Sequence, residues 1–156
     1  TGELGLARKG LEEIKKNCNK NIYRKKNVKR FIFPELRLEI SNSISQFASS
    51  CIDVSDGFIA DLEKILIPSN QGAVINLDKI PRIDKSSLED FTFGDDLELI
   101  FTADKKYHKK IMKLSDDSRI NISLLGQTKK NSGIKYLLNS DEVLFPRKKG
   151  WNHGKK

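Results

Sequence analysis

The sequence has few of the residues that mark secreted, membrane or metal–sulfur proteins. Its 156 residues include two cysteines and two histidines, and no apolar run approaches the ~20 residues that a membrane helix needs. Cys18 and Cys51 lack metal-ligand spacing and fall on apolar faces, so both are expected to be reduced thiols in the core. Because no signal peptide precedes the first predicted helix, the cytoplasm is the expected compartment.

Internal repeats and low-complexity stretches are also lacking, and aromatic residues make up only 8% of the chain. With 37% hydrophobic and 32% charged residues, the composition is typical of a globular protein whose surface is rich in lysine. The length permits a real hydrophobic core. We therefore expect residues 1–156 to form a single domain, of which 147–156 are a basic tail.

The net charge of +8 is unevenly distributed. Residues 1–48 carry 11 basic and 5 acidic side chains, residues 49–146 carry 13 and 16, and residues 147–156 carry five basic and no acidic ones. The basic ends leave open a nucleic-acid-binding module as an alternative function. The run at residues 24–30 lacks interleaved aromatic residues and favours a solvated loop or short irregular helix, with a phosphate-attracting rim as its functional alternative.

Hydrophobic periodicity predicts alternating helices and strands. The first predicted helix follows a strand end and turn at residues 1–5 and runs to about residue 18. The others run from Pro34 through a stripe of Leu36, Ile40, Ile44 and Phe47, over 58–66, and over 104–114, where Asp104 is the expected cap. The predicted strands are 51–54, 72–77, 97–102, 120–125, 134–138 and 142–145. Because these elements lack simple βαβ regularity, the pattern indicates a mixed α/β or α+β fold with helices packed on a mixed sheet.

The most informative segment is the predicted junction of the strand 51–54 with the helix 58–66. Asp53, Ser55 and Asp56 lie at this junction, followed by Gly57. Since residues two apart share one face of a strand, Asp53 and Ser55 should point together while Val54 enters the core. Hard oxygen ligands at such a point suit Mg²⁺, which leaves other positions to water and phosphates.

A structural interpretation of the same residues stays open. Either Ser55 or Asp56 is expected to be the N-cap of the following helix, since both residue types cap well. Capping does not account for Asp53, a charged residue in an apolar strand that is expected to be buried. From the residues alone, a metal or phosphate role and a purely structural role are equally favoured.

A second acidic group, Gly94-Asp95-Asp96, precedes the predicted strand 97–102. Neighbouring residues in extended chain face opposite ways, so Asp95 and Asp96 should have different roles, one bracing the turn and the other facing a ligand. The structural alternative is an Asx-type turn. Glu98 is expected to be the solvent-facing residue of a half-buried strand.

The tail carries the only tryptophan, Trp151, beside His153. Trp151 either fills an edge of the core or offers a stacking surface to a flat ligand, preferably a cationic one. His153 has no visible partner that would favour catalysis, and His108 is expected at the surface.

In this order, the motifs resemble the C-terminal half of the thiamine-monophosphate kinase family, within the aminoimidazole-ribotide synthetase-like superfamily. The resemblance covers nearly the whole chain, and the matching segments are Thr1-Gly-x-Leu-Gly5, Pro34-x-x-Arg37, Ile52-Asp-Val-Ser-Asp-Gly-Phe-x-x-Asp-Leu62, Gly72-Ala-x-Ile75, Gly94-Asp-Asp-x-Glu-Leu-x-Phe-Thr102 and Gly150-Trp-x-His153.

The resemblance implies transfer of the γ-phosphoryl group of ATP onto thiamine monophosphate, which gives thiamine diphosphate. It implies Mg²⁺ as cofactor, held by Asp53 and Asp56, an ATP contact by Ser55, and contacts of Asp95 and Trp151 with the thiamine substrate. A carboxylate and an indole face suit a cationic thiazolium ring, and phosphoryl transfer requires no protein nucleophile.

The chain departs from the family pattern in three ways. Asp95 stands where the family has Glu, Gly154 replaces an aromatic residue, and the family's N-terminal half is missing. That half carries most nucleotide and Mg²⁺ contacts and much of a homodimer interface, so this chain alone is expected to be inactive. A related superfamily enzyme that acts on another small substrate is the remaining alternative.

Overall fold

The computed structural model describes residues 1–16, 20–84, 87–130, 133–145 and 150. The helices in this part of the chain are α1 (Leu6–Lys16), α2 (Lys26–Ile32), α3 (Leu38–Ser45), α4 (Phe58–Leu66) and α5 (His108–Ser118). The strands are β1 (Ala48–Asp53), β2 (Gln71–Asn76), β3 (Leu99–Ala103), β4 (Gly126–Lys130), β5 (Ile134–Leu138) and β6 (Asp141–Val143). Short 3₁₀ segments lie at Lys20–Arg24, Leu77–Lys79, Glu89–Phe91 and Lys105–Tyr107. The predicted mixed α/β fold is confirmed.

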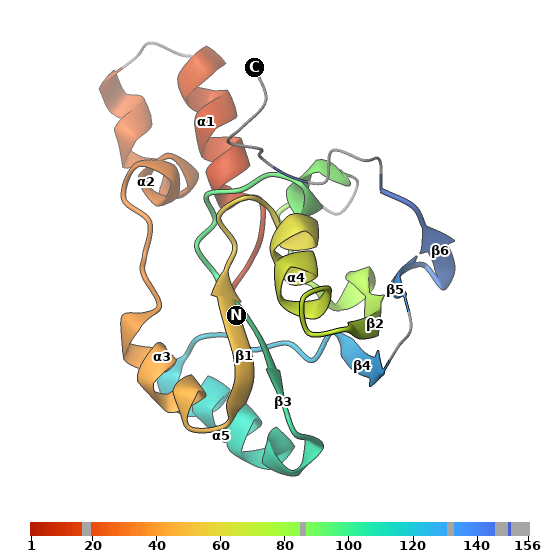
Figure 1. Ribbon diagram of the computed structural model, residues 1–156. Helices are drawn as coiled ribbons and strands as arrows, with labels where there is room; N and C mark the ends of the chain where they lie inside the picture. Colours follow the sequence, from red (N-terminus) through yellow and green to blue (C-terminus); the bar gives the residue numbers. More distant parts are fainter. Residues whose placement is uncertain (17–19, 85–86, 131–132, 146–149, 151–156) are drawn as a thin grey trace.

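The strands form two separate ladders. β1 pairs with β3 in antiparallel fashion, and the second sheet has the order β4-β2-β5-β6. In that sheet β2 and β5 are parallel, whereas the two outer pairs are antiparallel. Figure 1 shows α1 and α2 at one end of the β1–β3 ladder, α3 and α5 at the other, and α4 between this ladder and the second sheet.

Two apolar clusters hold these layers together. The larger cluster lies around α4, whose residues Phe58, Ile59, Leu62 and Leu66 are buried against β2 and β5. The smaller one joins α3 and α5 to the β1–β3 ladder around Ile40, Ile44, Phe47 and Ile122. The predicted helix 58–66 is confirmed at both ends. Its apolar residues lie on one face of the helix, and burial of that face is what the pattern predicts.

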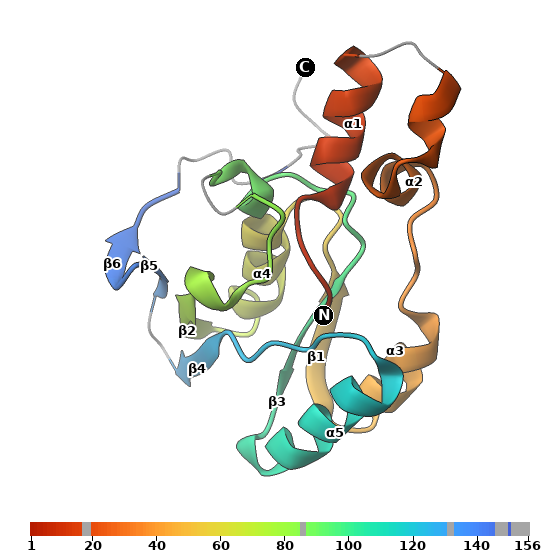
Figure 2. The ribbon, with the colours of Figure 1, turned by 180° about the vertical axis from the view of Figure 1, so that it is seen from behind.

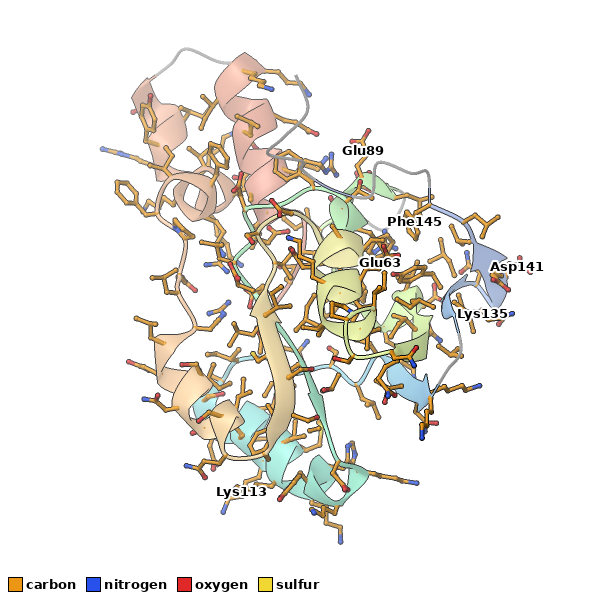
Figure 3. All side chains as sticks on the ribbon, in the orientation of Figure 1. Glu63, Glu89, Lys113, Lys135, Asp141 and Phe145 are labelled. Carbon is orange, nitrogen blue, oxygen red and sulfur yellow. The ribbon has the colours of Figure 1, made fainter. Side chains whose placement is uncertain are left out.

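The face of α4 toward β5 also carries a polar tie. The hydroxyl of Tyr136 donates to Oε1 of Glu63 at 3.3 Å, and the Tyr136 ring packs edge-on against Phe145 at 5.4 Å between ring centroids. Figure 3 shows Glu63 and Phe145 on this side of α4. Burial raises the pKa of the Tyr136 phenol, and the neighbouring Glu63 carboxylate raises it further. The phenol therefore stays a hydrogen-bond donor at physiological pH.

Two predicted elements were wrong. Residues 120–125 are not a strand: Ile120 and Ile122 pack in the smaller cluster and Leu125 packs against the larger one, while Leu124 is exposed. The strand lies one step later, at β4, whose polar residues are mostly exposed because it is an edge strand. The helix expected from Pro34 begins only at Leu38, which leaves Leu36 outside it and exposed.

The N-terminal basic segment is more ordered than a solvated loop. It forms the 3₁₀ turn Lys20–Arg24 and the helix α2, which packs against α1 where Asn27 and Phe31 approach Gly10. A Cβ atom on Gly10 would overlap the carbonyl oxygen of Asn27, so the close approach of the two helices requires glycine there. Figure 2 shows α1 and α2 side by side from behind.

The expected burial of Cys51 was also wrong. Cys51 lies on the exposed face of β1, where exposed and half-buried residues alternate. Cys18 lies outside the described residues. His108 is exposed as expected, and Asp104 caps the 3₁₀ turn before α5 by accepting a hydrogen bond from the Lys106 backbone amide. Among the described helices, none has the length and apolarity to cross a membrane.

Candidate functional site

The turn between β1 and α4 is organised by a residue inside the helix. Asp61 is fully buried, and its Oδ2 accepts hydrogen bonds from the backbone amides of Ser55 and Asp56 at 2.9 Å and of Gly57 at 3.1 Å. Gly57 is the N-cap residue, with φ 119° and ψ 146°, a conformation that favours glycine. The expectation that Ser55 or Asp56 caps α4 through its side chain was therefore wrong.

Sequence reasoning did not assign a role to Asp61. The signal was present, because Asp61 stands on the same apolar face of α4 as Phe58 and Leu62. A charged residue on a buried helical stripe needs partners. Three backbone amides at the start of the same helix are the partners nearest in the chain.

Lys64 links Asp61, which organises this turn, to the carboxylate of Asp56. Nζ of Lys64 lies 2.6 Å from Oδ1 of Asp61 and 2.5 Å from Oδ2 of Asp56. Hydrogen bonds from the ammonium group to Asp56 and Asp61 raise the pKa of Lys64. Asp56 is thus held at the surface edge of the turn, with one oxygen already engaged by a cation.

Asp53 lies at the end of β1 and is exposed, so the expectation of a buried carboxylate was wrong. The expected alternation nevertheless holds, because Val54 is buried beside it. An exposed carboxylate needs no internal partner, and Asp53 is therefore available to a ligand.

The second acidic motif docks directly on the first. The backbone amide of Asp95 donates to the carbonyl of Ser55 at 3.1 Å, and that of Leu97 donates to the carbonyl of Val54 at 3.0 Å. A Cβ atom on Gly94 would overlap the Ser55 carbonyl oxygen, so only glycine allows this approach. Two motifs separated by about forty residues in the chain thus form one continuous surface.

The two adjacent aspartates of this motif have different environments, as predicted. Asp95 is exposed and has a φ of 66°. Asp96 is buried and accepts hydrogen bonds from the backbone amides of Gly5 at 2.8 Å and Ala7 at 3.1 Å, at the start of α1. Asp96 therefore braces α1, whereas the side chain of Asp95 is exposed.

Burial of the Asp96 carboxyl predicts a specific pH dependence of stability. Burial raises its pKa to about 6, although the amides of Gly5 and Ala7 act to lower it. In the unfolded chain, the pKa of an aspartate is about 3.9. Between pH 3.9 and pH 6, the folded protein therefore binds more protons at Asp96 than the unfolded chain does. The protonated Asp96 carboxyl thus stabilises the fold below about pH 3.9, and this stabilisation is lost as the pH rises through 6.

We therefore compare the wild type with Asp96→Asn by urea unfolding from pH 4 to pH 7. The difference in free energy of unfolding, wild type minus variant, should fall by about 2 kcal/mol over this range. Taking the difference cancels the titration of all other groups. A difference that does not change with pH would contradict the raised pKa.

Glu98 is buried, so its expected position facing solvent was wrong. Its Oε1 lies 2.6 Å from Nη2 of Arg30 and 2.5 Å from Nη2 of Arg37, and its Oε2 accepts hydrogen bonds from Nε of Arg37 and the hydroxyl of Thr1, both at 2.8 Å. Burial alone would raise its pKa, but the hydrogen bonds from Arg37 and Thr1 hold that pKa below the usual value.

The tail reaches the same surface. Gly150 lies against the start of α4, where a Cβ atom would overlap the carbonyl oxygen of Asp56 and the methyl group of Ala60. The residue that follows it in the chain is Trp151. Trp151 and His153 themselves lie outside the described residues, so their expected positions stay predictions.

The chemistry of the donor set fits part of a Mg²⁺ site. Asp53 and Asp56 offer hard oxygen atoms beside a turn, and Mg²⁺ often takes only one or two protein carboxylates. In the described part of the chain, no three His, Cys, Asp or Glu side chains are grouped closely enough to hold a metal ion. The remaining ligands would have to come from water, phosphate or another segment.

Comparison with known proteins identifies the family of relatives. No protein-family model matches the chain. Over 98% of its length, however, the chain is 36% identical to the thiamine-monophosphate kinase of Buchnera aphidicola from Acyrthosiphon pisum. The chain is homologous to thiamine-monophosphate kinases. The thiamine-monophosphate kinase of Leptospira interrogans is 29% identical over 93% of the chain.

Solved structures show the same fold. The thiamine-monophosphate kinase of Stenotrophomonas maltophilia superposes with a TM-score of 0.74 over 91% of the chain at 23% identity. A ThiL structure complexed with AMPPCP and TMP gives the same TM-score over 98% of the chain at 22% identity. In both cases the chain covers 49% of the solved protein. The chain likewise spans about half the length of the Buchnera kinase, 51%.

Proposed function

We propose that this chain is the C-terminal half of a thiamine-monophosphate kinase, a phosphotransferase that uses ATP and Mg²⁺. The observation that carries the proposal is the homology over 98% of the chain, which includes both acidic motifs. The backbone hydrogen bonds that join Ser55 to Asp95 support it, because they place the proposed nucleotide contacts beside the proposed substrate contact.

In the proposed reaction, an oxygen of the thiamine monophosphate phosphate forms a bond to the γ-phosphorus of ATP. The bond from that phosphorus to the β–γ bridging oxygen breaks, and ADP leaves with that oxygen. Bound Mg²⁺ supplies charge neutralisation on the phosphates. Such a reaction depends on positioning and electrostatic stabilisation, so the residues proposed here act by holding ligands.

We propose a role for each of the residues that the motifs single out. Asp53 and Asp56 would hold Mg²⁺, and the hydroxyl of Ser55 would contact ATP. Asp95, exposed on its turn, would contact the thiamine substrate, and Trp151 would stack on its ring. When Mg²⁺ binds, the Lys64 ammonium would either leave the Asp56 carboxylate or pair with the oxygen that the ion does not use.

The partner that the proposal requires is the other half of the kinase. Among the described residues, no third His, Cys, Asp or Glu side chain joins Asp53 and Asp56 in a group that could hold a metal ion, and the relatives are about twice as long as this chain. We propose that an N-terminal half supplies the remaining ligands and that the complete enzyme is a homodimer in the cytoplasm. The chain alone should then turn over little or no substrate.

The test is to assay ATP-dependent conversion of thiamine monophosphate, first with this chain alone and then with the chain fused to the N-terminal half of the Buchnera kinase. The fusion should be active and the chain alone inactive. Asp53→Asn combined with Asp56→Asn should lower the turnover of the fusion by at least about tenfold, because metal ions contribute several kcal/mol to such transition states.

The matched control changes two exposed aspartates of α5, Asp116→Asn and Asp117→Asn, which removes the same charge away from the turn. Its turnover should stay within about twofold of the unmodified fusion. Full turnover in the Asp53/Asp56 variant would refute the metal assignment. A fusion that is folded but inactive on thiamine monophosphate would refute the proposed substrate.

A further inference from the structure

A concave basic site lies apart from the acidic motifs. It has a volume of about 690 Å³ and lies between the first residues of the chain, the 3₁₀ turn and α2, the segment that leads into α3, and residues 119–121 after α5. Figure 2 shows these elements around the N-terminus. Asp53, Ser55, Asp56 and Asp95 do not line it. A volume of this size is typical of small-molecule sites.

The charge on the wall of this basic pocket is strongly unbalanced. Six cationic side chains line it against three carboxylates. Four of the cations are exposed and form no ion pair or side-chain hydrogen bond with the residues that the structure describes. These four are Arg24, Lys26, Lys29 and Arg119. Lysines scattered over a solvated surface act separately. These four cations instead line the same pocket, so their positive potentials add there.

The floor of the pocket does not compensate this charge. Arg30 and Arg37 share the single buried carboxylate of Glu98. The second carboxylate near Arg37 is Glu35, whose side chain is 75% exposed and contacts the guanidinium only at 3.4 Å. Two guanidinium groups are therefore fixed in position by one buried counter-charge, and the excess positive charge of the pocket lies on the four exposed cations.

An aromatic ring accompanies the cations. Phe33 lines the pocket and is 77% exposed, although a ring of this size would normally bury most of its surface. An exposed ring beside converging cations suits a ligand that has phosphate groups at one end and a flat ring at the other, since ring stacking and phosphate contacts are independent.

We propose that this pocket is a second ligand site, which binds a small molecule with a diphosphate group and a flat heterocycle, of the nucleoside diphosphate class. Lys26 and Lys29 on α2, with Arg24 and Arg119, contact the phosphates. Phe33 stacks on the ring. The site is independent of the proposed kinase residues and does not need Mg²⁺.

The test measures binding of inorganic pyrophosphate and of ADP to the whole chain by titration calorimetry, without Mg²⁺ and at an ionic strength of about 0.15 M, where the Debye length is about 8 Å. Both ligands should bind. Lys26→Glu combined with Lys29→Glu should lower both affinities by at least about tenfold, because two attractive charges become repulsive. Phe33→Ala should lower the affinity for ADP by about fivefold and leave that for pyrophosphate unchanged.

The control carries the same change of charge at a remote place, Lys109→Glu with Lys113→Glu on α5; Figure 3 shows Lys113 at the end of the molecule opposite α1 and α2. Its affinities should stay within about twofold of wild type, since distant surface charges are screened. Asp53→Asn with Asp56→Asn should also bind both ligands normally. Circular dichroism checks that each variant is folded.

Several results would overturn the proposal. Absence of binding, or binding that survives the Lys26/Lys29 reversal, would show that the pocket is not a phosphate site. Equal losses in the α5 control would show only diffuse attraction to a basic protein. Loss of binding in the Asp53/Asp56 variant would place the ligand in the proposed kinase site instead. An unchanged affinity for ADP in Phe33→Ala would refute the stacking role.

Discussion

Replacing Glu98 by glutamine is expected to lower the free energy of unfolding by about 3–5 kcal/mol. The reason is the asymmetry of a buried ion cluster. Two guanidinium groups, those of Arg30 and Arg37, depend on this one buried carboxylate, and the variant leaves them with a neutral amide. Removing one member of a buried pair costs far more than the intact pair contributes, because the remaining charge stays desolvated.

Urea unfolding at neutral pH measures this effect. The matched control is Glu35→Gln, which removes a carboxylate from the same Arg37 but at an exposed position. Exposed pairs contribute about 0–1 kcal/mol, so the control should remain close to wild type. If Glu98→Gln is too unstable to purify, Glu98→Asp should show an intermediate loss. Equal losses at positions 98 and 35 would contradict the cluster.

Replacing Asp61 by alanine is expected to have the second large effect on stability, about 3–4 kcal/mol. The variant leaves three backbone amides at the start of α4 without their acceptor and removes one of the two partners of Lys64. Each unsatisfied buried donor costs about 1–3 kcal/mol, and water that enters the relaxed turn recovers part of this. The turn that holds Ser55 and Asp56 should loosen at the same time.

Urea unfolding measures the stability, and hydrogen exchange of the amides of residues 55–57 measures the turn. Both should change in Asp61→Ala, whereas the exposed substitution Asp117→Ala on α5 should change neither. Asp61→Asn should be intermediate, because the amide oxygen still accepts hydrogen bonds but carries no charge. Normal protection of residues 55–57 in Asp61→Ala would show that Asp61 does not organise the turn.

Glu98, unlike Asp61, is a carboxylate that sequence patterns do not distinguish from a surface residue. The rule of alternation was applied to Glu98 as part of a predicted strand, but β3 begins only at Leu99, and Leu97 has a left-handed φ of 51°. Thr1, α2 and the segment before α3 cover the Glu98 side chain, and none of these contacts is local in the chain. Tertiary packing therefore decided the burial of this residue.

The sequence by itself determined the elements with strong, local signals. The stripe of Phe58, Ile59, Leu62 and Leu66 specified α4 because burial of one helical face is a local property. The motifs around Asp53 and Asp95 could likewise be found without coordinates, and their order along the chain indicated the family. The edge strand β4 could not be found, since a strand with mostly exposed polar residues has no hydrophobic period.

Only the tertiary structure decided which acidic residues are structural and which remain available to ligands. Asp61, Asp96 and Glu98 are buried and hold a turn, a helix start and two arginines, whereas Asp53 and Asp95 are exposed. Apart from Asp61, which stands on an apolar helical face, these carboxylates look alike in the sequence. Their environments differ because a buried carboxylate requires hydrogen-bond donors. Asp96 and Glu98 receive donors from residues 1–7, a segment that only folding brings next to them.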